Sequence, residues 1–79
     1  MNTENELLDI LQDYLDFPVS ELDRGLPLAY AAAMSSFTFM HMVAALEERF
    51  SIRIPNTDLA ELRSADDLLA YLQRRLNVR

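Results

Sequence analysis

Residues 36–55 read SFTFMHMVAALEERFSIRIP, the most informative segment of the chain. Its apolar side chains recur at i, i+4, i+7 and i+11, the spacing of one face of an α-helix. The predicted buried stripe consists of Phe39, Val43, Leu46 and Phe50, with Met42 beside it. Ser35 or Ser36 can cap the start of this helix, because a serine hydroxyl accepts a hydrogen bond from a first-turn N–H. Ile52, Ile54 and Pro55 close its exit.

Another helix is predicted near the N-terminus. Thr3 and Glu6 form a T-x-x-E capping box, a signal for a helix start. Apolar residues then recur at helical spacing, namely Leu7, Leu8, Leu11, Tyr14 and Leu15. We expect Phe17-Pro18 to end this helix, because the residue before proline avoids the α region.

Residues 18–35 are predicted to form a long connection. Pro18, Gly25 and Pro27 interrupt any periodicity, whereas Val19, Leu22, Leu26 and Leu28 are apolar enough to fix the connection to a core. Connections of this length are uncommon and usually functional. Residues 29–34 have high helix propensity, so a short extra turn is expected there.

Two more helical segments are expected after residue 55. Residues 56–61 suit one short turn, and Ser64 with Asp67 is a start signal for a last helix. That helix would point Leu68, Leu69, Leu72 and Leu76 inward and place Arg74 and Arg75 near its C-terminus, where cations suit the helix dipole. The predicted fold is therefore all-α, with three longer helices and a short one, in one domain of residues 1–79.

The composition excludes several classes of function. The net charge is −6, and residues 1–23 contain seven acidic residues and no basic one. This charge repels nucleic acids and anionic lipids and favours partners with basic patches. The chain has no cysteine, which excludes disulfides and thiolate metal sites.

Neither a secretory signal nor a membrane span is predicted. The first residues lack the basic start and apolar run of a signal peptide, which favours a cytoplasmic location. Residues 25–46 contain no Asp, Glu, Lys or Arg and are long enough to cross a bilayer. Because they include Pro27, Ser35, Ser36, Thr38 and His41, we interpret them as a buried helix and the loop before it.

The order of these elements, with LEERFSIRIP at residues 46–55, resembles the acyl and peptidyl carrier protein family. The motif L-E-x-x-F-x-I-x-I-P is fairly specific, because helix periodicity does not require Ile-x-Ile-Pro after Phe50. The resemblance covers essentially the whole chain. It implies a small four-helix bundle with a long loop between its first and second helices, a monomer, and a carrier rather than an enzyme.

The resemblance also implies a prosthetic group. Ser36 corresponds to the serine that a phosphopantetheinyl transferase modifies with phosphopantetheine from coenzyme A. Separate enzymes would then load, modify and unload an acyl or aminoacyl cargo in fatty acid, polyketide or nonribosomal peptide biosynthesis. The position is physically suitable, because a phosphodiester there faces the positive end of the helix dipole.

The chain departs from the family pattern around Ser36. Ser35 replaces an acidic residue, Phe37 replaces Leu or Met, and Ala33 replaces a glycine, although alanine adopts positive φ only at a cost. Ser35 is a second candidate for attachment, but the spacing to Phe50 favours Ser36. The departures leave an alternative open, a degenerate carrier fold that docks to a partner without bearing the arm. An enzyme or metal-binding domain rests only on scattered carboxylates.

The same helix is predicted to contact partner enzymes. The candidate partner-binding residues are Phe37, Met40, His41, Ala44, Glu47 and Glu48. Phe37 and Met40 would be apolar anchors; alternatively, Phe37 folds back onto the preceding loop. The scarcity of charge on this face indicates a less electrostatic and more dedicated set of partners. His41, the single histidine, is interpreted as a surface residue rather than a catalytic base.

Overall fold

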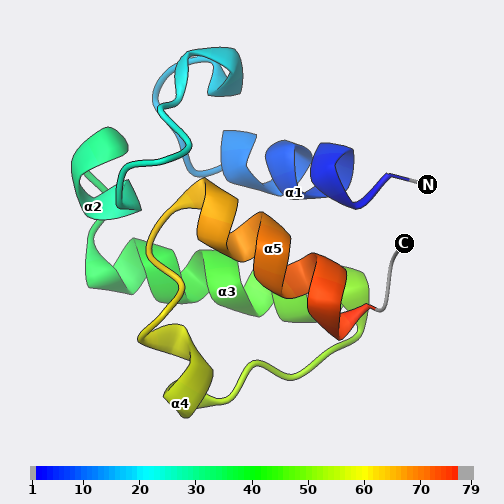
Figure 1. The fold of residues 1–79 in the computed structure, drawn as a ribbon. Coiled ribbons are helices and arrows are strands. Elements are labelled where there is room, and N and C mark those ends of the chain that lie inside the picture. Colours follow the sequence, from blue (N-terminus) through cyan, green and yellow to red (C-terminus); the bar gives the residue numbers. More distant parts are fainter. Residues whose placement is uncertain (1, 77–79) are drawn as a thin grey trace.

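Three amphipathic helices bury their apolar faces against one another. The computed structural model describes residues 2–76. The long helices are α1 (Thr3–Gln12), α3 (Ser36–Phe50) and α5 (Ala65–Arg75). Short turns lie between them: the 3-10 turn η1 (Val19–Glu21), α2 (Leu28–Ala31) and α4 (Asn56–Leu59). Helix α1 packs against both α3 and α5, while α2 and α4 lie at the periphery (Figure 1). The predicted all-α bundle is confirmed.

The core is built mainly from leucines of the long helices. Its fully buried large side chains are Leu7, Leu11, Leu28, Met42, Leu46, Leu68 and Leu72. Burying one such side chain contributes roughly 1.5–3 kcal/mol. On α3, Val43 and Leu46 of the predicted stripe are buried, and Met42 beside the stripe is fully buried. Phe39 and Phe50, at the two ends of the stripe, are only partly buried.

The predicted start of α1 was wrong by one residue. Asn2 is the N-cap, and its Oδ1 accepts a hydrogen bond from the Asn5 N–H at 3.2 Å. Asparagine is the stronger capping residue, so it displaces Thr3 into the first helical position. The Thr3–Glu6 capping box is therefore not formed, and the Glu6 carboxylate instead lies 3.6 Å from the Arg49 guanidinium.

Helix α1 also ends earlier than the predicted Phe17-Pro18 boundary. Its last residue is Gln12, whose side chain turns toward the segment that follows. The Gln12 amide donates to the Phe17 carbonyl at 2.9 Å and accepts from the Val19 N–H at 2.7 Å. These side-chain hydrogen bonds replace further helical turns, so Tyr14 and Leu15 contact the core from a turn.

The start of α5 holds the long connection in place. Ser64 and Asp67 form the predicted capping box. Hydrogen bonds from the Ser64 and Arg63 backbone lower the pKa of Asp67 against the opposing effect of partial burial. Beside this cap, the Leu28 N–H donates to the Arg63 carbonyl at 2.8 Å, and the Asp66 N–H donates to the Arg24 carbonyl at 3.0 Å. The connection is thus held against the start of α5 at Arg24 and at Leu28, the first residue of α2.

Helix α4 is joined to α5 by Tyr71, a residue that no sequence motif marked. Tyr71 is buried, and its hydroxyl donates to the Asp58 carboxylate at 2.6 Å. The Arg75 guanidinium donates to the same phenol oxygen at 2.5 Å. Burial, and then the hydrogen bond to Asp58, raises the pKa of Tyr71 above its ordinary value. This contact fixes a helix of only four residues that could not form alone.

None of the helices in the described range is both long enough and apolar enough to cross a membrane.

We expect Tyr71→Phe to lower the free energy of unfolding by about 1 kcal/mol, the net value of a hydrogen bond. Urea denaturation measures this change. The matched control is Tyr30→Phe, because Tyr30 is 81% exposed and its loss of a hydroxyl should leave stability unchanged. An unaltered unfolding midpoint for Tyr71→Phe would contradict the role given to this hydroxyl.

The same tyrosine predicts a dependence on alkaline pH. The raised pKa of Tyr71 means that its neutral form is favoured in the folded state. Its contribution is therefore fully present below the unfolded pKa of about 10 and is lost as pH rises through the folded pKa. As the pH rises through the folded pKa of Tyr71, the free energy of unfolding of the wild type should fall more steeply than that of Tyr71→Phe.

Candidate functional site

The two serines at the start of α3 have different environments. Ser35 is the N-cap, and its hydroxyl oxygen accepts from the Thr38 N–H at 3.1 Å. The same hydroxyl donates to the Thr38 side-chain oxygen at 3.1 Å. Ser36 is the first residue of the helix and is exposed, and its hydroxyl has no hydrogen-bond partner within residues 2–76. The Ser36 oxygen is thus free to form a covalent bond, whereas that of Ser35 serves the helix.

The surroundings of Ser36 suit an anionic group. First-turn N–H groups have no intrahelical acceptors, and the helix dipole places partial positive charge there. No acidic residue lies in the first turn of α3. A phosphate ester on the Ser36 oxygen therefore meets favourable partial charge and no carboxylate from that turn, so the residues present fit a phosphodiester-linked group.

The turn that leads into α3 contains a strained residue. Ala33 has φ of 51°, in the left-handed region that glycine adopts without penalty. As expected for an alanine, this conformation of Ala33 has a cost, which is roughly 1–2 kcal/mol. Ala33 reverses the chain between α2 and Ser35, while the neighbouring Met34 is buried and its N–H donates to the Leu28 carbonyl at 3.2 Å. Burial of Met34 and this hydrogen bond offset the strain.

Beyond Ser36, α3 presents an exposed and largely uncharged face. Phe37 is 74% exposed, so it does not fold back onto the loop. Its ring packs against that of His41 with centroids 4.6 Å apart and planes inclined at 56°. Met40 is 46% exposed, and Ala44 is exposed as well.

The two acidic candidates on α3 differ. Glu48 is exposed. Glu47 is half-buried, and its carboxylate accepts from the Ile54 N–H at 2.7 Å. The carboxylate of Glu47 therefore anchors the segment after α3. A role of Glu47 in partner binding stays a prediction.

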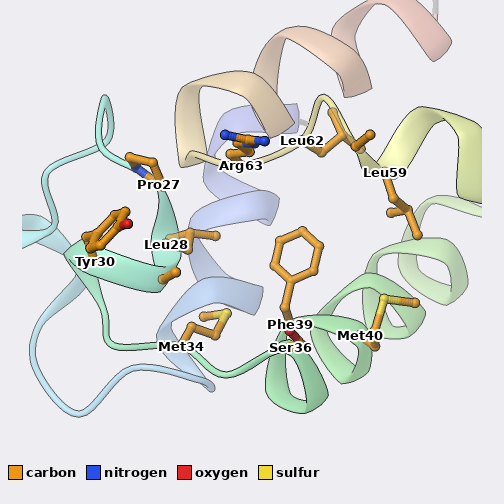
Figure 2. Close-up of a pocket in the computed structure, with 12 residues that line it drawn as sticks. Pro27, Leu28, Tyr30, Met34, Ser36, Phe39, Met40, Leu59, Leu62 and Arg63 are labelled. Carbon is orange, nitrogen blue, oxygen red and sulfur yellow. The ribbon is translucent and has the colours of Figure 1, made fainter.

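An open groove with a volume of about 570 Å³ lies beside Ser36. Its walls come from α2, α3 and the loop around α4, and most of the lining side chains are apolar (Figure 2). Phe39 projects from α3 into this space, with Met34 and Leu28 to one side and Met40 and Leu59 to the other. Arg63 lies across the groove from Ser36.

No pattern in the sequence predicted this groove. The sequence feature that could have indicated the groove is the uncharged run of residues 25–46, which supplies its α2 and α3 walls. No local pattern marked Leu59, Leu62 or Arg63, because only the packing of α4 brings them opposite α3. Within residues 2–76, no group of histidines and carboxylates is arranged to hold a metal ion.

One family model and several known proteins are similar to this chain over most of its length. Residues 5–72 match the family model described as "Phosphopantetheine attachment site". An acyl carrier protein from Kineococcus radiotolerans is 35% identical, across 94% of this chain and 96% of its own length. An acyl carrier protein from Chlamydia caviae is 24% identical over 95% of this chain and 97% of its own length. A meromycolate extension acyl carrier protein from Mycolicibacterium aurum is 25% identical over 86% and 70%.

The strain at Ala33 predicts that Ala33→Gly raises the free energy of unfolding by up to about 1 kcal/mol. Relief of the left-handed conformation outweighs the greater chain entropy that glycine adds to the unfolded state. Chemical denaturation provides the test. Ala44→Gly is the control, because Ala44 is an exposed residue within α3 and the same change there should destabilise by about 1 kcal/mol. Equal destabilisation by both changes would contradict the strain.

Proposed function

Because the chain belongs to the phosphopantetheine attachment family of acyl carrier proteins, we propose that it tethers thioester intermediates on phosphopantetheine bound to Ser36. Members of this family are carriers rather than enzymes, and their prosthetic group is joined covalently. The observation that carries the assignment to Ser36 is the contrast between its free, exposed hydroxyl and the Ser35 hydroxyl, which caps α3.

In the proposed modification, the Ser36 oxygen becomes bonded to the phosphorus that carries pantetheine in coenzyme A. The pyrophosphate bond breaks, adenosine 3′,5′-bisphosphate leaves, and the serine proton passes to a base of the transferase. The bound group supplies a terminal thiol, which a chain without cysteine lacks. The protein's own part is to expose Ser36, to place it at the positive end of α3, and to raise the effective concentration of cargo at partner sites.

The cargo is proposed to be an acyl group. The curated relatives are named acyl carrier proteins, and one is named for meromycolate extension. The apolar groove beside Ser36 offers a surface on which an acyl chain can leave water. Fatty acid and polyketide biosynthesis are therefore favoured over nonribosomal peptide biosynthesis, and a cytoplasmic location stays a prediction.

Partner enzymes, the phosphopantetheinyl transferase among them, are proposed to dock on the exposed face of α3 through Phe37, Met40, His41, Ala44 and Glu48. No charged residue occurs from residue 25 to residue 46, whereas seven acidic residues occur in residues 1–23. The surface around Ser36 therefore offers aromatic and aliphatic contact area rather than charge. We expect a partner with a complementary apolar patch, and docking that depends little on ionic strength.

The first test is intact-protein mass after incubation with coenzyme A, magnesium and a broad-specificity phosphopantetheinyl transferase. Wild type and Ser35→Ala should gain one phosphopantetheine unit, and Ser36→Ala should gain none. If wild type gains none, also with a transferase from the same source, the alternative applies, namely a carrier fold that docks without the arm. If Ser36→Ala gains the phosphopantetheine unit and Ser35→Ala does not, the attachment site is Ser35.

The docking surface is tested by Phe37→Ser. Loss of one exposed aromatic anchor should lower kcat/KM for modification about tenfold, equivalent to ~1.4 kcal/mol. The melting temperature should not fall, because Phe37 is 74% exposed. Leu26→Ser is the matched control, since Leu26 is an exposed apolar residue of the long connection and does not belong to α3. An equal loss in both variants would remove the case for a specific surface.

A further inference from the structure

The groove beside Ser36 combines an apolar lining with a single charge. Of its lining residues, all of which lie in the described part of the chain, Arg63 alone is ionised at neutral pH. Ser36 and Arg63 lie on opposite sides of the groove, and the Phe39 ring stands between them (Figure 2). Acyl cargo on an arm at Ser36 that folds back into the groove can therefore lie along the apolar lining with its far end near a guanidinium.

The backbone of Arg63 is held from two directions. Its carbonyl accepts from the Leu28 N–H at 2.8 Å, which ties it to α2. Its own N–H donates to the Asp67 carboxylate at 3.1 Å, which ties it to the start of α5. The backbone of Arg63 is therefore fixed beside the groove, and the residue is exposed.

The guanidinium of Arg63 has no ion-pair partner within residues 2–76. By contrast, Arg24 pairs with Glu4 and Arg49 pairs with Glu6. The pKa of Asp67 is lowered mainly by the hydrogen bond from the Ser64 backbone, and the charge of Arg63 contributes least. The Oδ2 atom of Asp67 is occupied by the N–H groups of Arg63 and Ser64 in the capping box. Arg63 is thus available to an external anion.

We propose that the groove accommodates acyl cargo whose far end carries a carboxylate, and that Arg63 pairs with this carboxylate. This inference rests on the proposed attachment at Ser36. The volume of about 570 Å³ lies within the range of roughly 300–1,000 Å³ typical of small-molecule sites. A guanidinium matches a carboxylate in geometry as well as in charge. The substrate class is therefore the half-thioester of a dicarboxylic acid.

The test uses the holo-protein loaded with thioesters of matched length: octanoyl, suberoyl and the methyl ester of suberoyl. Intact mass first verifies the arm and each load. The rate of thioester cleavage by hydroxylamine is then measured, and each rate is divided by that of the corresponding free pantetheine thioester. Cargo held in the groove is shielded from the nucleophile, so slower cleavage reports its residence there.

In wild type, suberoyl should be cleaved more slowly than its methyl ester by about fivefold, the upper range for an exposed ion pair. Arg63→Gln should bring this ratio to one without changing the octanoyl rate, and Arg63→Lys should restore part of it. Raised salt should reduce the ratio. The matched control is Arg53→Gln, because Arg53 is also exposed but lines a separate hollow with Glu47 and Pro55.

A wild-type ratio of one, or a ratio that Arg63→Gln leaves unchanged, overturns the proposal. The phosphodiester of the arm is a second possible anion for Arg63, and phosphorus NMR of the unloaded holo-protein separates the two. A phosphorus resonance that shifts in Arg63→Gln, with no preference for suberoyl in wild type, assigns Arg63 to the arm and overturns the proposal. Absence of the arm from the mass spectrum overturns the function proposed for Ser36 as well, so the two failures are distinguishable.

Discussion

A backbone contact between residues 27–28 and residues 63–64 couples the long connection to the start of the last helix. Pro27 and Ser64 form an isolated antiparallel bridge, and the Leu28 N–H donates to the Arg63 carbonyl beside it. This contact lets Leu28 reach the core and places α2 next to α3. Because Ser64 also caps α5, a few hydrogen bonds couple the long connection, the last helix and one wall of the groove.

The two adjacent serines at the start of α3 have different roles. Ser35 satisfies the first-turn N–H of Thr38, and Ser36 is left exposed without a structural task in the described part of the chain. An aspartate at position 35 could cap the helix equally well, so the family's acidic residue is not required for the fold. Its absence alters the charge offered to a partner, and the uncharged face around Phe37 is consistent with that change.

Charge and apolar surface are separated along the chain. The acidic residues of α1 and the following loop lie in residues 1–23, and the aromatic and methionine side chains exposed near Ser36 lie in residues 30–40. Among the residues that line the groove beside Ser36, Arg63 is the cationic one, and it lies on the side opposite Ser36. In a carrier of this kind, net charge supports solubility. Apolar contacts and one guanidinium would provide the recognition of cargo and partners.

Local sequence patterns were enough to predict the helix-forming segments, the all-α class and the capping box of α5. They were also enough to predict the likeness to a carrier family, because the L-E-x-x-F-x-I-x-I-P segment is continuous in the sequence. The same patterns placed the ends of α1 wrongly, because Asn2 and Thr3 compete for one cap and Gln12 forms side-chain contacts with later residues. Only the tertiary structure decided that Glu47 anchors Ile54, that Tyr71 holds α4, and that Arg63 faces Ser36 across a groove. These contacts join residues whose partners are chosen by the packing of whole helices, and no local pattern encodes that packing.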